Sequence, residues 1–148
     1  MLSFTLRLFS CLALSLALHL SAATATDIQG EWIADGAATW ASMKSAPQMV
    51  GLPPEQQKMI QEMILTQSAS MGFTVTADKF ISNQGEQKKE VSYKVTGITG
   101  DKISTDGTDA SGKVEKIDLI LKDGTLSLSN MDQPGVQMVL KRKPAAAK

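Results

Sequence analysis

The stretch Val91-Ser92-Tyr93-Lys94-Val95-Thr96 alternates apolar and polar residues with a period of two. This period is typical of a β-strand with one face buried and the other in water. Similar stretches recur at residues 102–105, 114–121, 125–129 and 136–140, separated by turns rich in Gly and Asp. The sequence from Phe73 to Arg142 therefore predicts short antiparallel strands that follow one another in a meander.

A further strand is expected upstream, over residues 26–34, with Ile28 and Trp32 on the same side of the pleat. With this strand the count reaches about eight, a number at which antiparallel sheets close into small barrels. The fold class that we predict is mainly β, an antiparallel meander closing into a small barrel. Residues of about 36–71 predict one or two α-helices inserted between the first and second strands.

The longer of the inserted helices has a clear start and a clear apolar stripe. Leu52-Pro53-Pro54-Glu55 is typical of a first helical turn, where the missing proline N–H has no consequence. The helix is expected to reach about Ser70, and its stripe consists of Met59, Ile60, Met63 and Ile64. We expect this stripe to pack on the sheet.

The two ends of the chain are expected to lie outside the fold. Arg7, an apolar run over residues 8–20 and the small-residue pattern Ala23-x-Ala25 are typical of a secretory signal peptide cleaved after Ala25. The apolar run is shorter than the roughly 20 residues that span a bilayer, so no stable membrane span is expected. This predicts a secreted or periplasmic protein with a single domain at 26–142 and a disordered tail at 143–148.

The composition after residue 25 excludes several kinds of chemistry. The only cysteine, Cys11, and the only histidine, His19, both lie in the predicted signal peptide. Catalysis by Cys–His or Ser–His–Asp groups, imidazole or thiolate metal sites and disulfides are therefore excluded from the mature chain. With 15 basic and 15 acidic residues the chain also lacks the basic excess of a nucleic-acid binder. No cofactor and no catalytic residue are predicted.

Gly30-Glu31-Trp32 opens the first predicted strand, and Arg142, the only arginine after residue 25, ends the last one. This combination resembles the small secreted lipocalin-like barrels of the calycin type. The resemblance implies that Arg142 packs over Trp32 and closes the barrel, a cation–π contact worth about 0.5–2 kcal/mol. The chain departs from that family in its helical insertion, its short length and the lack of the family's second motif.

Methionine is unusually frequent in the insertion, which contains five of the eight: Met43, Met49, Met59, Met63 and Met71. Three interpretations remain open. The flexible thioethers fill an irregular core between helices and sheet, or they form an adaptable lid or interaction face. The third is a copper(I) site formed by Met59 and Met63.

Carboxylates gather around two predicted turns, at Asp101, Asp106, Asp109 and Glu115. Their spacing does not match a calcium-binding loop and fits ordinary hairpin turns. None of them lies in an apolar context that would raise its pKa for glycoside hydrolysis.

The function expected from these features is non-enzymatic binding of a small apolar or amphipathic ligand between barrel and helices. The candidate contacts are Trp40, Met59, Met63, Phe73 and Tyr93. The alternative is a structural or protein-interaction module of the cell envelope whose barrel is filled by its own side chains. A large pocket along the methionines favours the first function, and a packed interior with an apolar outer helix face favours the second. An enzyme that uses carboxylates alone is the third reading.

Overall fold

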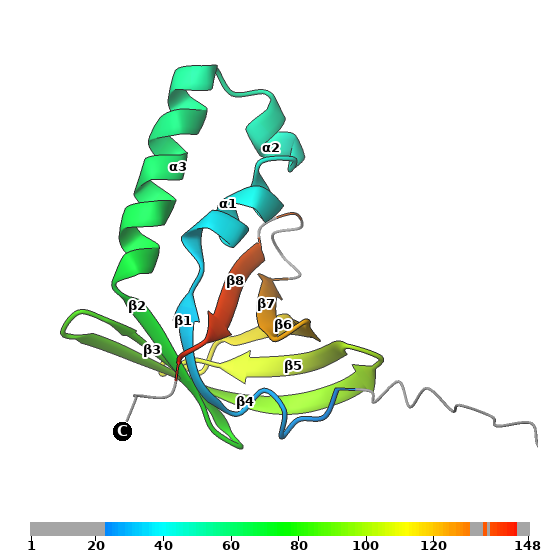
Figure 1. Ribbon diagram of the computed structural model, residues 1–148. Helices are drawn as coiled ribbons and strands as arrows, with labels where there is room; N and C mark the ends of the chain where they lie inside the picture. The colour runs from blue at the N-terminus through cyan, green and yellow to red at the C-terminus, as the bar shows by residue number, and fades with distance from the viewer. Residues whose placement is uncertain (1–22, 131–134, 136, 145–148) are drawn as a thin grey trace, which may run out of the picture.

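The computed structural model describes residues 23–130, 135 and 137–144. It shows a closed eight-stranded antiparallel barrel with three helices between the first two strands (Figure 1). The strands are β1 (Gly30–Ala34), β2 (Met71–Val75), β3 (Lys79–Gln84), β4 (Gln87–Thr99), β5 (Lys102–Thr108), β6 (Val114–Lys122), β7 (Thr125–Asn130) and β8 (Gln137–Arg142). The helices are α1 (Gly36–Met43), α2 (Pro47–Val50) and α3 (Pro54–Ala69). The predicted fold class is confirmed.

Each strand pairs with the next along the chain, and β8 closes the barrel against β1. Trp32 of β1 lies opposite Phe73 on one side and opposite Arg142 on the other. The largest difference from the predicted strands is at β1, which begins at Gly30 because residues 26–29 form a turn. In that turn the Gln29 amide donates to the Thr26 carbonyl at 3.1 Å. Val136, the predicted start of the last strand, lies outside the described residues.

The barrel interior is filled by side chains from the strands. Eight strands enclose a space that side chains can just fill. The most deeply buried interior residues include Trp32, Val75, Ile103, Leu126 and Leu140, each at most 2% exposed. A cavity of about 60 Å³ remains beside Phe80, Tyr93 and Leu128, far below the several hundred Å³ typical of small-molecule sites.

Arg142 closes the barrel at the end away from the helices. Its guanidinium carbon lies 4.1 Å from the centroid of the Trp32 ring, so the predicted cation–π contact is confirmed. The guanidinium also donates to the Gln29 carbonyl at 2.5 Å and to the Asp27 carbonyl. The Trp32 indole N–H donates to the Ile28 carbonyl at 2.8 Å. These bonds tie the chain before β1 to the last residue of β8.

Gly30 makes this closure possible. Its φ is +123°, a conformation that L side chains rarely adopt, and a Cβ there would lie 2.6 Å from Arg142 Nη1. The position two residues before Trp32 therefore requires glycine on steric grounds, because the Arg142 side chain passes over the backbone there.

Segments at the predicted domain ends also contact the barrel. Ala23 is buried, and its amide donates to the Gly100 carbonyl at 3.1 Å. At the other end, Lys143 donates its amide to the Glu31 carbonyl at 3.0 Å, although the sequence places it in the tail. The predicted signal peptide up to residue 22 and the rest of the tail from 145 lie outside the described residues.

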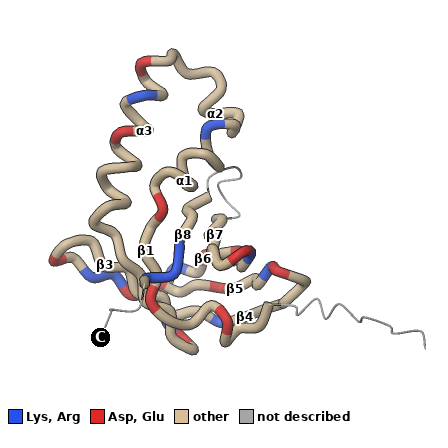
Figure 2. Tube along the Cα trace, viewed as in Figure 1, with Lys and Arg blue, Asp and Glu red and all other residues tan. Residues whose placement is uncertain are grey.

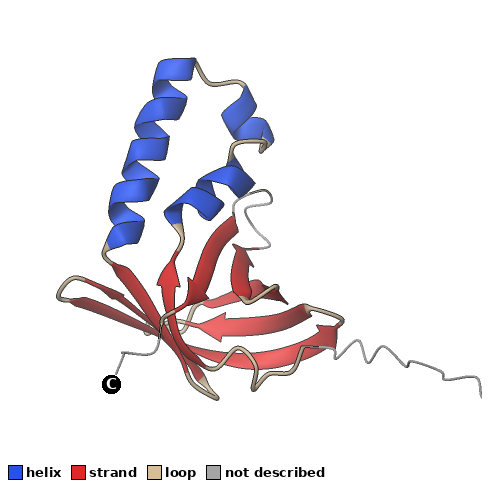
Figure 3. Cartoon of the chain, viewed as in Figure 1, coloured by secondary structure: helices blue, strands red, loops and turns tan. Residues whose placement is uncertain are grey.

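The three helices form an arm, residues 36–69, that stands away from one end of the barrel (Figures 1 and 3). In this helical arm α3 packs chiefly against α1. The expectation that Met59, Ile60, Met63 and Ile64 together pack on the sheet is wrong. Ile60 and Ile64 are half-buried, whereas Met59 and Met63 are exposed. Within the described part of the chain, no helix is long and apolar enough to span a membrane.

Candidate functional site

Hydrogen bonds to β8 hold the base of the helical arm. The Asp35 amide donates to the Val139 carbonyl at 2.8 Å, and the Val139 amide donates to the Thr39 hydroxyl at 2.9 Å. One turn further along α1, the Ser42 hydroxyl donates to the Gln137 carbonyl at 3.2 Å. The first helix therefore continues the hydrogen bonding of the strand that closes the barrel, which fixes the direction in which the arm leaves.

Asp35 caps the N-terminus of α1. One of its carboxylate oxygens accepts from the Ala38 amide at 3.0 Å, and the other lies 3.5 Å from the Lys141 ammonium. The Ala38 bond, followed by the nearby charge of Lys141, lowers the pKa of Asp35 below its ordinary value, against the opposing effect of its partial burial. The ionised cap thus stabilises the junction between barrel and arm.

A glycine allows α1 and α3 to approach closely. A Cβ on Gly36 would lie 3.0 Å from Ser68 Cβ and 3.1 Å from Leu65 Cα. The side of α3 that faces α1 consists of half-buried residues at helical spacing: Gln57, Ile60, Gln61, Ile64 and Ser68. The two helices are therefore packed backbone to backbone at their bases.

The opposite side of α3 faces water. We define the outer face of α3 as Gln56, Met59, Met63 and Thr66, all of which are exposed. Met59 is 68% and Met63 50% exposed. The charged residues of α3 lie in the half of the helix nearer the tip of the arm (Figure 2), and the exposed Glu55 and Glu62 lie one turn from Met59 along the helix. None of the 16 described residues of α3 is buried. This is an unusual state for a helix in an otherwise packed domain.

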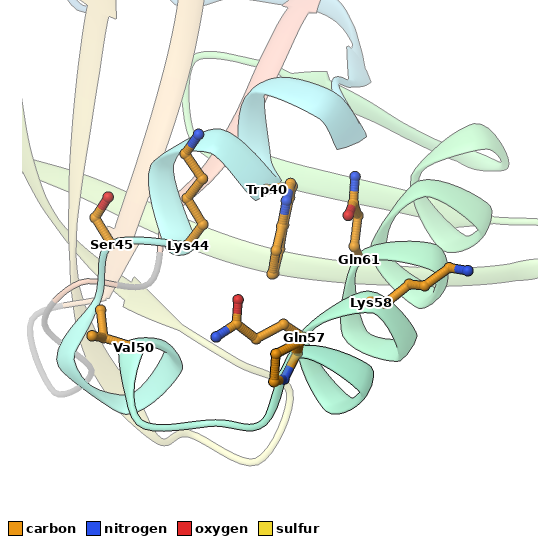
Figure 4. A pocket seen from close by; sticks show the side chains of 8 residues that line it. Trp40, Lys44, Ser45, Val50, Gln57, Lys58 and Gln61 are labelled. Atoms are coloured by element: carbon orange, nitrogen blue, oxygen red, sulfur yellow. The ribbon is translucent and has the colours of Figure 1, made fainter.

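An open groove of about 540 Å³ lies within the arm, between α1, α2 and α3 (Figure 4). The half-buried ring of Trp40 stands in the middle of it, beside the side chains of Gln57 and Gln61. Lys44 lies on the α1 side and Lys58 on the α3 side. No carboxylate is among the described residues that line the groove.

Gln57 fixes the shape of this groove. Its side-chain amide donates to the Met49 carbonyl at 3.1 Å and to the Leu52 carbonyl at 2.9 Å. These bonds hold α2 and the following loop against the first turns of α3. The groove is therefore built into the fold of the arm and does not depend on a bound molecule for its form.

The five predicted ligand contacts lie in three separate places. Trp40 is in the groove, and Met59 and Met63 are on the outer face of α3. Phe73 is buried in the barrel, with its ring centroid 5.4 Å from that of Phe80. Tyr93 is half-buried in the barrel. No cavity of the described residues brings the five together.

Tyr93 has a structural role inside the barrel. Its hydroxyl donates to the Thr76 carbonyl at 2.7 Å. Burial, with a smaller contribution from the nearby Asp78 charge, raises the pKa of Tyr93. The hydroxyl is therefore held in its neutral, donating form.

A second hollow lies where the helical arm meets the barrel. Its volume is about 150 Å³, and its apolar lining includes Met43, Ile64, Met71 and Met138. Three of these four residues are methionines, as expected for flexible side chains that fill an irregular junction. The hollow lies in the predicted position, between barrel and helices, but its volume is below the usual range for a small-molecule site.

Of the four carboxylates predicted near turns, Asp109 forms one, whereas Asp106 and Glu115 lie within β5 and β6. Asp109 accepts from the Ser111 hydroxyl at 2.5 Å, from the Ser111 amide at 2.8 Å and from the Lys113 amide at 3.0 Å. The bond from the Ser111 hydroxyl is the main cause that lowers the pKa of Asp109. The prediction of hairpin chemistry is confirmed at this residue. Among the described residues no three His, Cys, Asp or Glu side chains are grouped so that they could hold a metal ion.

No protein-family model, curated protein or solved structure matches this chain. The site must therefore be judged on its own geometry. Sequence reasoning placed Trp40 at a candidate site but missed Lys44, Lys58 and Val50, which line the same groove. These three residues come from different helices, and no local sequence pattern predicts that the helices bring them together.

Proposed function

We propose that this protein is an exported, non-enzymatic protein-interaction module with a lipocalin-like barrel. The barrel is the scaffold, and the outer face of α3 is the surface that binds a partner. The observation that carries the proposal is the exposure of Met59 and Met63 on a helix in which none of the described residues is buried. A filled barrel with an apolar outer helix face is the arrangement expected of an interaction module.

The chemistry of the face indicates the kind of partner. Two methionines one turn apart are anchors of the type that amphipathic helices insert into an apolar groove of another protein. Thioethers adapt to the shape of such a groove. Gln56 and Thr66 beside them are uncharged, and the exposed Glu55 and Glu62 lie one turn from Met59, so the complementary surface is an apolar groove with basic residues at its rim. The proposed partner is therefore a second, different protein that offers such a groove.

Photo-crosslinking in the exporting cell tests this proposal. A photoreactive amino acid replaces Met59 or, as a control, Val114, an apolar residue of β6 that is 58% exposed on the barrel. We expect one defined partner to be crosslinked from position 59 and not from position 114. Equal crosslinking from both positions, or crosslinking only to a second copy of this chain, would contradict the proposal.

The crosslinked partner is then purified and titrated with variants. Met59→Lys combined with Met63→Lys should raise Kd by at least about tenfold, equivalent to about 1.4 kcal/mol, because it places charges in an apolar groove. Val114→Lys should bind as the wild type does. A partner that binds the double variant with unchanged affinity would show that the arm is not the binding surface.

Binding of a small ligand between barrel and helices remains the second candidate. The junction hollow of about 150 Å³ with its three methionines is the observation that favours it. Native mass spectrometry of the purified protein checks it, since a ligand retained at the junction adds a constant mass that Met71→Trp, by filling the hollow, should remove.

Export itself is part of the proposal, and the start of the mature chain is measurable. Cleavage after Ala25, as the sequence predicts, would remove the buried Ala23 and the bonds that Thr24 makes to the Asp27 carboxylate, both at 2.8 Å. The intact mass of protein from culture medium or periplasm gives the first residue directly. Thr26 as the first residue would confirm the predicted site, and an uncleaved cytoplasmic chain would contradict export.

A further inference from the structure

We propose that the groove between α1, α2 and α3 binds an anionic amphiphile, an organic molecule with an aromatic or alkyl body and one carboxylate, sulfonate or phosphate group. This site is distinct from the outer face of α3. The groove and that face lie on different sides of the helix, and the two proposals rest on different residues.

The apolar part of the site comes from Trp40, Val50 and Pro54. The indole of Trp40 stands in the middle of the groove and presents a flat surface for stacking (Figure 4). A volume of about 540 Å³ falls within the range of known small-molecule sites. Because the Gln57 bonds hold the groove open, little of the binding free energy is spent on ordering the arm.

The charges of the groove select the sign of the ligand. Lys44 and Lys58 lie on its two sides, and no carboxylate of the described residues lines it. Lys58 is 4.0 Å from Glu62, and both side chains are largely exposed, so this pair is weak. The Lys58 side chain is turned away from Trp40 (Figure 4), and its flexible stem lets the ammonium swing towards a ligand in the groove. Lysine ammoniums on flexible four-carbon stems bind carboxylate and phosphate groups as point charges. A neutral or cationic amphiphile gains no binding free energy from the two ammonium groups.

Two fluorescent probes with nearly the same apolar body separate the charge from the stacking. 8-Anilino-1-naphthalenesulfonate has a sulfonate, and N-phenyl-1-naphthylamine lacks it. Titration of the purified protein is followed by quenching of tryptophan emission through energy transfer to the probe. Trp40→Phe measures how much of the signal comes from Trp40, because the buried Trp32 is then the remaining donor and energy transfer from it needs no contact with the probe.

We expect the anionic probe to bind and Lys44→Ala combined with Lys58→Ala to weaken it by about fivefold or more, as two exposed charge contacts imply. The neutral probe should bind more weakly and equally to both proteins. Lys94→Ala, which removes an exposed lysine of β4, is the matched control and should change nothing. Decanoate should displace the anionic probe at lower concentrations than decanol does.

Three results would overturn this proposal. One is an anionic probe that binds the double lysine variant as tightly as the wild type. The second is equal displacement by decanoate and decanol. The third is loss of the probe on Met59→Gln combined with Met63→Gln, which would place it on the outer face of α3. The lysine and glutamine changes are at exposed positions, so they leave the fold intact and each result concerns the site alone.

Discussion

The barrel and the helical arm contain one tryptophan each, and the two residues differ in how deeply they are buried. Trp32 is 1% exposed, bonded through its indole N–H and covered by the Arg142 guanidinium. Trp40 is half-buried at the centre of an open groove. The difference is one of packing: the barrel buries its tryptophan, and the arm leaves part of its tryptophan exposed.

The difference follows from how each region is built. In the barrel every strand has two hydrogen-bonded neighbours, so alternate side chains of each strand point inwards and bury one another. The arm has two layers only, α1 and α3, and the far side of α3 meets water. A helix with one covered side retains exposed apolar residues wherever its sequence places them on the other side.

Trp32→Ala should have the largest effect on stability, because it removes the largest interior side chain and leaves a cavity under Arg142. We expect a loss of about 3–5 kcal/mol in the free energy of unfolding. Trp40→Ala should lose less than about half of this, since its ring is partly exposed. Urea denaturation followed by circular dichroism measures both. Similar losses for the two variants would mean that the arm contributes to stability as the barrel does.

Gly30→Ala should have the next largest effect. The new methyl group would meet Arg142 Nη1, and the positive φ of +123° would strain an alanine in any case. Backbone strain, together with loss of the stacking on Trp32, predicts about 2–3 kcal/mol of destabilisation. Gly97→Ala in β4 is the control, because nothing lies within 4 Å of a Cβ there and its φ is not positive. An unchanged urea midpoint for Gly30→Ala would argue against the steric account of the Gly-x-Trp motif.

The strands were predictable because the sequence patterns that mark them are local. A period of two marks each strand, and Gly or Asp at the turns marks its ends, as in Lys122-Asp123-Gly124 between β6 and β7. The pair of Trp32 and Arg142 was reached through a resemblance and not from spacing. The structure adds the physical reason, since Gly30 gives the guanidinium room to pass.

The packing of α3 was not predictable in the same way. Periodicity shows which residues share a side of a helix, but it does not show which side is covered. The sequence stripe of Met59, Ile60, Met63 and Ile64 straddles the boundary between the covered and the exposed sides of the helix. Gln57 and Gln61 take covered positions instead, and Gln57 does so because its amide bonds the α2 region. The groove depends on such contacts between helices, so only Trp40 could be proposed for it beforehand.

Asp35→Ala tests the joint between the two regions and should cost about 1 kcal/mol through loss of the N-cap. The pKa of Asp35 in the folded protein is lowered from its ordinary value of 3.8. Its contribution is therefore present above that value and is lost as pH falls through the lower, folded pKa. The difference in Tm between wild type and variant should be constant near neutral pH and should shrink below about pH 4. A difference that stays constant in acid would mean that the carboxylate charge is not involved.

Gly36→Ala should give the smallest change in overall stability and the sharpest separation of arm from barrel. The new Cβ would lie 3.1 Å from the Leu65 backbone, so α1 and α3 must move apart at their bases while the barrel is unaffected. The gain in helix propensity, which is about 0.5–1 kcal/mol inside a helix and smaller at this first residue of α1, offsets part of this strain. We expect Tm to change by less than about 3 °C and the amides of α3 to exchange with solvent several times faster, because local opening is easier. Gly51→Ala, also in the arm but with nothing within 4 Å of its Cβ, should leave this exchange unchanged. Faster exchange in β5 and β6 as well as in α3 would show that arm and barrel unfold as one unit, and the distinction between scaffold and binding arm would then fail.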